Sequence, residues 1–401
     1  MNARRVYIDV RPLLDSHYSG IGRYVQGLLL ALQESLCEDP LQGISFHFLM
    51  PVSKNINRLA TFDAALFKPA RLPISHGAMN YLIEHGICPP LDLFLPKGLF
   101  VFTNYTDIPT IRSESIAFVY DLSFIVVPEF VHPVNRKFLA KRVPSTVRKS
   151  KAVVTISESS KNDISGRFGV DPEKIFVIYP SIDHRKFRRA TPEAVKLAKK
   201  KYGIDGEYLL FVGNIEPRKN IAGILEAYRK LNSGLRKRNS LVLVGGSGWL
   251  NEEIFLSIRD YQSKGYRVIL PNSHVADDDM PALYSGATLL LLPSHYEGFG
   301  IPLLEAMACG TPLLTSRNSS LPEVAGDAAI YVDPMDPADI CTGIESVLTD
   351  ERLRRSLVEK GIEQGARFSW RKSAETFRKL IVESLPSLGQ RYNSGVRGGS
   401  P

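Results

Sequence analysis

The sequence predicts an α/β protein made of two doubly wound domains, each a parallel sheet covered on both faces by helices. Short apolar runs rich in β-branched and aromatic residues alternate with helical patterns, and this alternation occurs once in each half of the chain. Near-continuous apolar runs separated by helices are typical of parallel strands buried on both faces. A third observation, a charged segment with prolines between the halves, indicates where one domain ends.

The strands follow from these runs in chain order. In the first half we expect strands at 6–10, 44–50, 99–103, 116–120, 152–156 and 175–179. In the second half we expect them at 208–213, 241–246, 267–270, 287–293 and 312–316.

The domain limits follow from where the strand signals stop. Around residues 180–194 they give way to PSIDHRKFRRATPEA, so we assign 1–187 to the first domain and 188–368 to the second. Residues 369–385 carry an apolar stripe at helical spacing and predict a helix. Residues 386–401 show no packing pattern and are expected to be disordered.

Composition places the chain among ordinary globular proteins. Of its 401 residues 44% are hydrophobic and 23% charged, and no apolar run approaches the roughly 20 residues of a membrane span. The N-terminus lacks the apolar stretch of a signal peptide, so we expect a cytoplasmic protein. Its four cysteines lie far apart, without metal-site spacing, and are expected to be reduced and buried.

A net charge of +8 favours anionic partners such as nucleotide phosphates, a lipid diphosphate, an acidic membrane surface or nucleic acid. Seven cations gather between residues 136 and 151, around apolar residues of a predicted helix. Two interpretations remain open for them: contact with anionic lipids at the inner face of a membrane, or a solvated helix face interrupted by Pro144. No nucleic-acid recognition motif accompanies the charge, so no nucleic-acid partner is expected.

The most informative segment is LLLLPSHYEGFGIPLLEAMACGT, residues 289–311, which predicts a strand, a glycine loop and a short helix. Pro302 suits the first helical position, where we expect the helix to begin, and Gly310 suits the C-terminal cap. The helix amides, with those of the loop, favour an anion. Because carboxylates repel phosphates, Glu297 and Glu305 are expected to accept hydrogen bonds from neighbouring hydroxyls. The combination indicates a nucleotide sugar.

The E-x7-E spacing from Glu297 to Glu305, opened by EGFG, resembles the signature of retaining glycosyltransferases of family four, which have the two-domain GT-B fold. The resemblance implies two Rossmann-like domains facing each other across a cleft, with 369–385 crossing back to the first domain. It implies that Glu297 contacts the donor sugar and Glu305 the ribose hydroxyls. The donor-binding backbone would come from Gly298, Phe299, Gly300 and Ile301.

The loop GNIEPRKN, residues 213–220, follows the first strand of the second half. Arg218 and Lys219 should therefore lie at the carboxyl end of a parallel strand, where open α/β sheets bind ligands, with Asn220 as N-cap of the next helix. By resemblance, this basic pair stabilises the leaving diphosphate. Some relatives have an arginine where Asn214 stands here.

Two further second-half segments belong to the predicted donor site. Gly246 in VGGSGW lets the backbone approach a ligand, and the resemblance places main-chain contacts to the base near Val275. Asp277, Asp278 and Asp279 contain a D-x-D that could hold a divalent metal with a diphosphate, but they open a helix, where capping explains them. We therefore expect no metal site.

The first half supplies the acceptor side. Gly20 and Gly22 lie in the loop after the first strand, and Ser157 faces the cleft or caps a helix. In VYDLSF, Tyr120 occupies the position where many relatives have histidine, and Asp121 follows it as a further catalytic candidate. Tyrosine does not exchange a proton at neutral pH as histidine does.

The residues and the resemblance together predict a retaining, metal-independent hexosyltransferase. It would use a nucleoside diphosphate sugar as substrate, GDP-mannose first and dTDP-rhamnose or a UDP-hexose next, and no cofactor. Its acceptor would be a saccharide or lipid-linked saccharide of bacterial polysaccharide assembly, with peripheral membrane contact as one of the two interpretations of the basic helix. The alternative is a non-catalytic sugar-nucleotide or glycan-binding module, in line with Tyr120 and Asn214.

Overall fold

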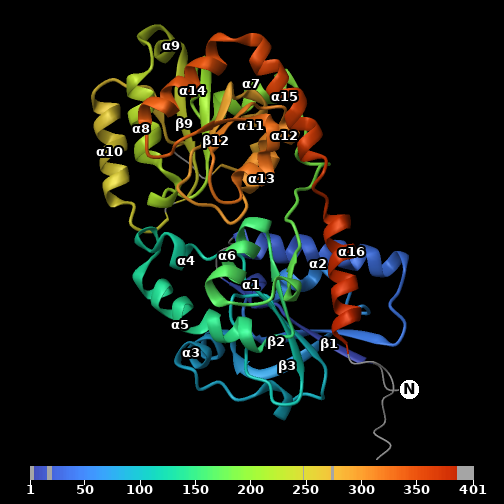
Figure 1. The fold of residues 1–401 in the computed structure, drawn as a ribbon. Coiled ribbons are helices and arrows are strands. Elements are labelled where there is room, and N and C mark those ends of the chain that lie inside the picture. Colours follow the sequence, from blue (N-terminus) through green and yellow to red (C-terminus); the bar gives the residue numbers. More distant parts are fainter. Residues whose placement is uncertain (1–3, 16–19, 247, 272–274, 386–401) are drawn as a thin grey trace, which may run out of the picture.

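The computed structural model describes residues 4–15, 20–246, 248–271 and 275–385. Two lobes lie one above the other, each with a central parallel sheet between layers of helices (Figure 1). The architecture confirms the predicted α/β class with two doubly wound sheets. The expected disordered tail, 386–401, lies outside the described residues.

The first sheet has seven parallel strands in the order β3-β2-β1-β4-β5-β6-β7. Their bounds are β1 (Arg4–Asp9), β2 (Ile44–Val52), β3 (Phe67–Ser75), β4 (Leu99–Phe102), β5 (Glu114–Phe118), β6 (Ala152–Thr155) and β7 (Ile175–Val177). The chain builds outward from β1 to β3, then returns beside β1 with β4.

The second sheet has six parallel strands in the order β10-β9-β8-β11-β12-β13. Their bounds are β8 (Glu207–Val212), β9 (Asn239–Val244), β10 (Val268–Ile269), β11 (Leu289–Leu292), β12 (Leu313–Ser316) and β13 (Ala329–Val332). The return occurs here between β8 and β11, which pair through Leu209 and Leu289. Each sheet therefore has a switch point, and a ligand crevice forms beyond the carboxyl ends of the strands there.

Helices cover both faces of the two sheets (Figure 1). In the first lobe they are α1 (Arg11–Leu14), α2 (Gly20–Glu38), η1 (Ile56–Thr61), α3 (His76–His85), η2 (Leu91–Leu93), α4 (Ser123–Val126), η3 (Pro128–Phe130), α5 (Pro133–Lys149), α6 (Glu158–Phe168) and η4 (Pro172–Lys174). In the second lobe they are α7 (Pro192–Lys201), η5 (Pro217–Lys219), α8 (Ile221–Lys230), α9 (Ser233–Arg238), α10 (Glu252–Ser263), α11 (Met280–Gly286), α12 (Ile301–Cys309), α13 (Leu321–Ala325), η6 (Gly326–Ala328), α14 (Pro337–Thr349) and α15 (Glu351–Gly365).

The last helix, α16 (Trp370–Ser384), belongs by sequence to the end of the chain but lies alongside α2 on the first lobe (Figure 1). Its Phe377, Leu380 and Ile381 are buried in the first-lobe core. The chain thus crosses between lobes twice. On the outward crossing, Ile182 already packs in the second-lobe core.

Two details differ from the sequence-based expectations. Helix α5 runs through Pro144 without a break, so the expected interruption of its surface is wrong. Cys309 and Cys341 are buried as expected, but Cys88 is only half-buried and Cys37 is exposed on α2. In the described part of the chain, no helix has the length and apolarity needed to cross a bilayer.

Candidate functional site

The predicted donor residues meet at the carboxyl edge of the second sheet. Arg218 and Lys219 lie in η5, just beyond the end of β8, and Glu297 lies in the loop after β11. Because β8 and β11 are neighbours at the switch point, these two loops lie side by side. The backbone N–H of His295 donates to the carbonyl oxygen of Arg218 at 2.9 Å and ties the loops together.

Glu297 is held by both cations. Its Oε1 lies 2.5 Å from Lys219 Nζ, and its Oε2 lies 3.0 Å from Arg218 Nη1. The Ser294 hydroxyl donates to Oε1 at 2.9 Å. Burial raises the pKa of Glu297, but Lys219 and Arg218 outweigh that effect and bring it to about 2. The carboxylate is therefore charged at neutral pH.

Glu216 is a member of this network that sequence reasoning missed. Its Oε1 accepts from Arg218 Nη2 at 2.8 Å, and its Oε2 has no hydrogen-bond partner although it is buried. Burial raises the pKa of Glu216, and the nearby Arg218 opposes this. A signal existed in the string EPRK, where Glu216 precedes the two cations by two and three residues.

The EGFG loop is shaped by its glycines and by two serines after β12. The Ser319 hydroxyl accepts from the N–H of Glu297 at 3.0 Å, and the Ser320 hydroxyl donates to the carbonyl oxygens of Glu297 and Phe299. Gly300 has φ of +101°, a conformation that side chains rarely adopt, at the N-cap of α12. Phe299 packs its ring against Phe368, so only its backbone faces the site.

The C-terminal cap predicted for this segment is confirmed, and the helix begins one residue before the predicted start at Pro302. Helix α12 begins at Ile301 with Pro302 in its first turn, and Gly310 caps its C-terminus with φ of +74°. Asn220 is likewise the N-cap of α8, where its side chain accepts from the N–H of Gly223. Local sequence chemistry thus fixes both helix N-termini near the charged network.

Glu305 lies in a separate environment on α12. Its Oε2 accepts from the Tyr284 hydroxyl at 2.5 Å. Burial raises the pKa of Glu305 to about 7; the Tyr284 hydrogen bond and Arg23 of the first lobe oppose this rise, and Asp277 adds to it. Unlike Glu297, this side chain has no ion pair among the described residues.

Asp121 brings the first lobe to the EGFG loop. A β-carbon built on Gly298 would lie 2.8 Å from Asp121 Oδ2, so only glycine leaves room for this approach. Asp121 Oδ1 accepts from the Tyr105 hydroxyl at 3.2 Å and from the N–H of Ser123 at 3.0 Å. The structure therefore places Asp121, Gly298 and Glu297 around one region between the lobes.

Other first-lobe candidates are placed less directly. Tyr120 is buried and its hydroxyl donates to the carbonyl oxygen of Thr103 at 2.6 Å, while burial raises its pKa far above the usual range. Ser157 is fully buried as the N-cap of α6, with its hydroxyl accepting from the N–H of Ser160. Gly20 and Gly22 lie in the first turn of α2, so the expectation that they belong to a loop is wrong.

The remaining second-lobe candidates lie after β9 and before α11. Gly246 is exposed after β9, and its carbonyl oxygen accepts from the N–H of Ile215 at 2.9 Å. Val275 is buried before α11. The sequence led us to expect that the three aspartates after it cap α11, but their side chains do not. They form separate ion pairs with Arg23, Lys186 and Lys201 instead. They do not converge on one point.

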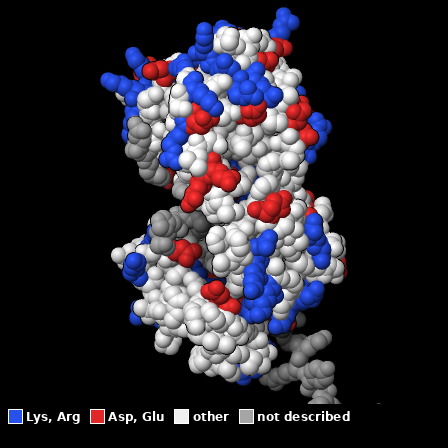
Figure 2. All heavy atoms as spheres, turned by 90° about the vertical axis from the view of Figure 1, so that its left-hand side faces the viewer, with Lys and Arg blue, Asp and Glu red and all other residues white. Residues whose placement is uncertain are grey.

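Several contacts join the lobes across the indented waist that Figure 2 shows. The Trp249 indole N–H donates to the carbonyl oxygen of Phe130 at 2.7 Å, and the Phe130 ring stacks on His295. The Glu323 carboxylate accepts from the first two N–H groups of α6, at 2.8 and 3.2 Å. The described conformation therefore has the lobes in contact around the site.

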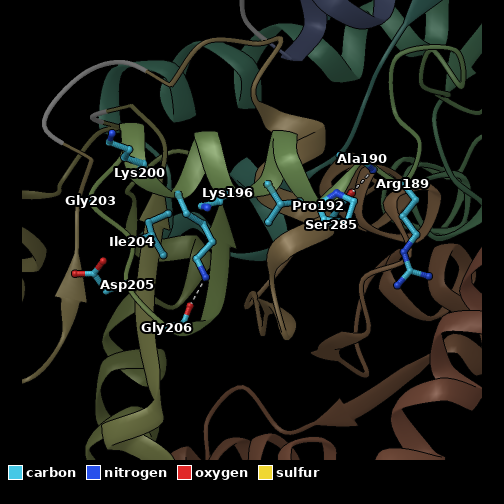
Figure 3. Close-up of a pocket in the computed structure, with 12 residues that line it drawn as sticks. Arg189, Ala190, Pro192, Lys196, Lys200, Gly203, Ile204, Asp205, Gly206 and Ser285 are labelled. Atoms are coloured by element: carbon cyan, nitrogen blue, oxygen red, sulfur yellow. Dashed lines mark hydrogen bonds between the residues drawn. The ribbon is translucent and has the colours of Figure 1, made fainter.

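A hollow of about 670 Å³ on the second lobe lies elsewhere. It is lined by α7, the loop 203–206 and Ser285, and Figure 3 shows Lys196 and Lys200 on its wall. Gly206 directly precedes β8, so this hollow lies at the amino edge of the sheet. Parallel α/β sheets bind ligands at the opposite edge, and none of the predicted site residues lines it.

Two facing doubly wound lobes, with a basic loop and an acidic glycine loop at the switch point of the second, define the GT-B class of glycosyltransferases. The family model for "Glycosyl transferases group 1" matches residues 195–364. The chain is 33% identical over 264 residues to O-antigen chain mannosyltransferase B of Escherichia coli, covering 66% of this chain and 68% of that protein. The chain belongs to the group 1 glycosyltransferases.

A second relative agrees with this assignment, and a solved structure agrees with the fold. Serotype-specific mannosyltransferase WbdA of Escherichia coli is 31% identical over 257 residues, which is 63% of this chain but 31% of that longer protein. The crystal structure of WaaG, a glycosyltransferase involved in lipopolysaccharide biosynthesis, superimposes with a TM-score of 0.65 at 18% identity. The superposition covers 94% of this chain and 99% of the WaaG chain, and it therefore supports the fold of both lobes.

Proposed function

We propose that this glycosyltransferase moves a hexose, with mannose favoured, from a nucleoside diphosphate sugar to a saccharide acceptor with retention of configuration. The observation that carries the proposal is the Lys219–Glu297–Arg218 cluster at the switch point of the second sheet, with Asp121 of the first lobe against the adjoining Gly298. The names of two relatives, both mannosyltransferases, support the choice of sugar.

The charges of the cluster suit a diphosphate that arrives and leaves. Glu216 and Glu297 balance Arg218 and Lys219, so the buried cluster is neutral before the donor binds. A diphosphate adds negative charge beside the N-terminus of α12, where the cations and helix amides stabilise it. Lys219 released from Glu297 would then stabilise the charge that grows on the leaving group.

Glu297 would in turn be free to accept hydrogen bonds from the donor sugar. Glu305, with Tyr284 donating to it, would accept from the ribose hydroxyls. Asp121 would lie on the opposite wall, near the sugar and the acceptor hydroxyl. Two cations at the diphosphate provide charge that a divalent metal supplies in other transferases, and we therefore propose transfer without a metal.

The acceptor we propose is a growing saccharide on a lipid carrier, reached at the cytoplasmic face of an anionic membrane. The O-antigen relative supports this context, and the excess of positive charge agrees with it. No cofactor enters the scheme, because the nucleotide sugar is itself the activated substrate.

The test is release of nucleoside diphosphate from GDP-mannose, dTDP-rhamnose and UDP-glucose by the purified chain, with and without a mannose-containing acceptor, in EDTA. Acceptor-dependent release from GDP-mannose in EDTA supports the proposal. Release that requires a divalent ion would contradict its metal-free part.

The alternative is a non-catalytic binding module. Tyr120 favours it, because this residue replaces the histidine of many relatives and its hydroxyl already donates to the carbonyl oxygen of Thr103. Tight nucleotide-sugar binding with no release under any of these conditions would establish that module instead.

A further inference from the structure

One surface of the first lobe exposes large apolar side chains close together in the sequence. They lie on α3, on the turn after it, on η2 and in the segment before β5. They are Tyr81, Ile87, Leu93, Phe94 and Ile111, each more than half exposed. Single exposed apolar residues are common, but a group of five on one lobe indicates an interaction surface.

The five residues are brought together by what lies beneath them. Met79, Ile83 and Leu91 share one buried cluster, on which Phe138 of α5 also packs. The Asp92 carboxylate in η2 accepts from the N–H groups of Ile111 and its neighbour, at 2.9 and 2.6 Å. These contacts hold α3, η2, residue 111 and α5 as one unit.

Helix α5 lines this unit with positive charge. It carries six Lys and Arg residues and no Asp or Glu. Within the part of the chain that the structure describes, none of the six forms an ion pair with a carboxylate, whereas Glu351 of α15 pairs with both Arg354 and Arg355. The Arg142 guanidinium would lie 3.4 Å from a β-carbon on Gly86, at the end of α3. Glu84 adds one exposed carboxylate on α3.

We propose that these apolar residues and the first cations of α5 form a docking surface for an anionic lipid bilayer. The apolar side chains would enter the boundary of the headgroups, and the unpaired cations would meet lipid phosphates. Figure 2 views this side of the molecule and shows a broad area of the lower lobe without charged side chains, with Lys and Arg at its sides and Asp or Glu along its upper edge. An acidic protein would match the cations but not the exposed aromatic and aliphatic groups.

The surface leads to the site. Helix α5 follows η3, whose Phe130 contacts Trp249 and stacks on His295, two residues before Glu297. A bilayer against α3 and α5 would therefore present lipid-linked saccharides near the rim of the cleft. This role in acceptor delivery rests on the proposed function, whereas the docking itself does not.

The experiment is cosedimentation of the full chain with vesicles of phosphatidylcholine alone or mixed with phosphatidylglycerol. One variant removes charge, with Arg136→Gln, Lys137→Gln and Lys141→Gln. A second removes apolar surface, with Leu93→Ser and Phe94→Ser. The matched control is Lys196→Gln, Leu197→Ser and Lys200→Gln on α7, a second cationic helix with an exposed leucine. Nucleoside diphosphate affinity is measured on every variant.

We expect binding only to the anionic vesicles, weakened about tenfold or more by either surface variant and unchanged by the α7 control. Loss of vesicle binding in the α7 control, with normal binding by both surface variants, would overturn the proposal. The absence of vesicle binding by the parent chain would also overturn it. Binding that depends on the cations but not on Leu93 and Phe94 would overturn it in favour of nonspecific attraction. If the chain binds nucleoside diphosphate normally but does not bind vesicles, the docking proposal fails and the proposed function is not contradicted.

Discussion

At the scale of single residues, the site is a balanced set of buried charges. Arg218 lies between the carboxylates of Glu216 and Glu297, and Lys219 reaches the other oxygen of Glu297. Burial lowers the pKa of Arg218, but the two carboxylates raise it above its ordinary value, so the guanidinium stays charged. A buried charge is costly unless it forms an ion pair, and each charged side chain of this site forms one with Arg218, Lys219 or Glu297, which the reaction would also use.

Replacing Lys219 with alanine should lower kcat/KM about 100- to 1,000-fold, because a cation aimed at the leaving diphosphate is lost. Steady-state kinetics with GDP-mannose measures the effect, and circular dichroism checks that the fold persists.

The control for this change is Lys230→Ala, which removes a lysine that pairs only at the surface with Glu226. It should leave kcat/KM within about twofold, since exposed pairs contribute little. Equal activity of both variants would show that Lys219 has no part in catalysis.

Glu305 gives the chain a pH-dependent stability. Its folded pKa of about 7 lies above the ordinary value of 4.5, so the folded state binds more protons between these values and stability falls as pH rises through them. Glu305→Gln should remove this loss and stabilise the chain at pH 8, relative to pH 5, by about 1–3 kcal/mol. Urea unfolding of the parent chain and of Glu305→Gln at both pH values measures this change in stability. The same stability difference between the two chains at pH 5 and at pH 8 would refute the raised pKa of Glu305.

At the scale of elements, the segment that carries the site was the most predictable part of the chain. The strand, glycine loop and short helix of residues 289–311 all form, because Pro302 and Gly310 fix the helix limits locally. Strands β3 and β13 were missed. Strand β3 contains two prolines and alternates exposed with buried residues, which an edge strand tolerates, and β13 is a short edge strand on the other sheet.

Helix α16 offers a test of how the chain is held together. Phe377 is buried against Phe118 of the first lobe, with ring centroids 5.7 Å apart. Phe377→Ala should destabilise the first lobe by about 3–5 kcal/mol, as large-to-small changes in a core do. Urea unfolding followed by tryptophan fluorescence reports it.

The neighbouring Val382→Ala is the matched change on the exposed side of the same helix. Its cost should stay near 0.5 kcal/mol or less. A similar small cost for Phe377→Ala would mean that α16 does not contribute to the first-lobe core in solution.

At the scale of the whole molecule, the site depends on residues far apart in the chain. The Tyr296 hydroxyl donates to Asp163 of α6 at 2.9 Å, and Gly298 lies against Asp121. No periodicity or spacing encodes such contacts, so the sequence predicted the members of the site but not how the lobes meet. Glu216 was missed for another reason: it stands beside the two cations in EPRK, but only the structure shows that it is buried and bonded to Arg218.

Gly298→Ala tests the approach of the lobes. The added methyl would lie 2.8 Å from Asp121 Oδ2, so the Asp121 side chain or the EGFG loop would have to shift, and misplacement at the site should lower kcat about tenfold or more. Gly166→Ala on α6, where a methyl meets nothing within 4 Å, is the control and should retain full activity. Unchanged kcat in Gly298→Ala would show that this contact is absent during turnover.

The central claim is that Lys219, Arg218 and the α12 N-terminus hold a nucleoside diphosphate. Titration calorimetry with GDP, UDP, ADP and dTDP, on the parent chain and on Lys219→Ala, tests it directly. We expect one diphosphate to bind well above its unphosphorylated nucleoside, and Lys219→Ala to weaken it by about tenfold or more. Binding of nucleoside and diphosphate with equal affinity, or an unchanged affinity in Lys219→Ala, would contradict the account.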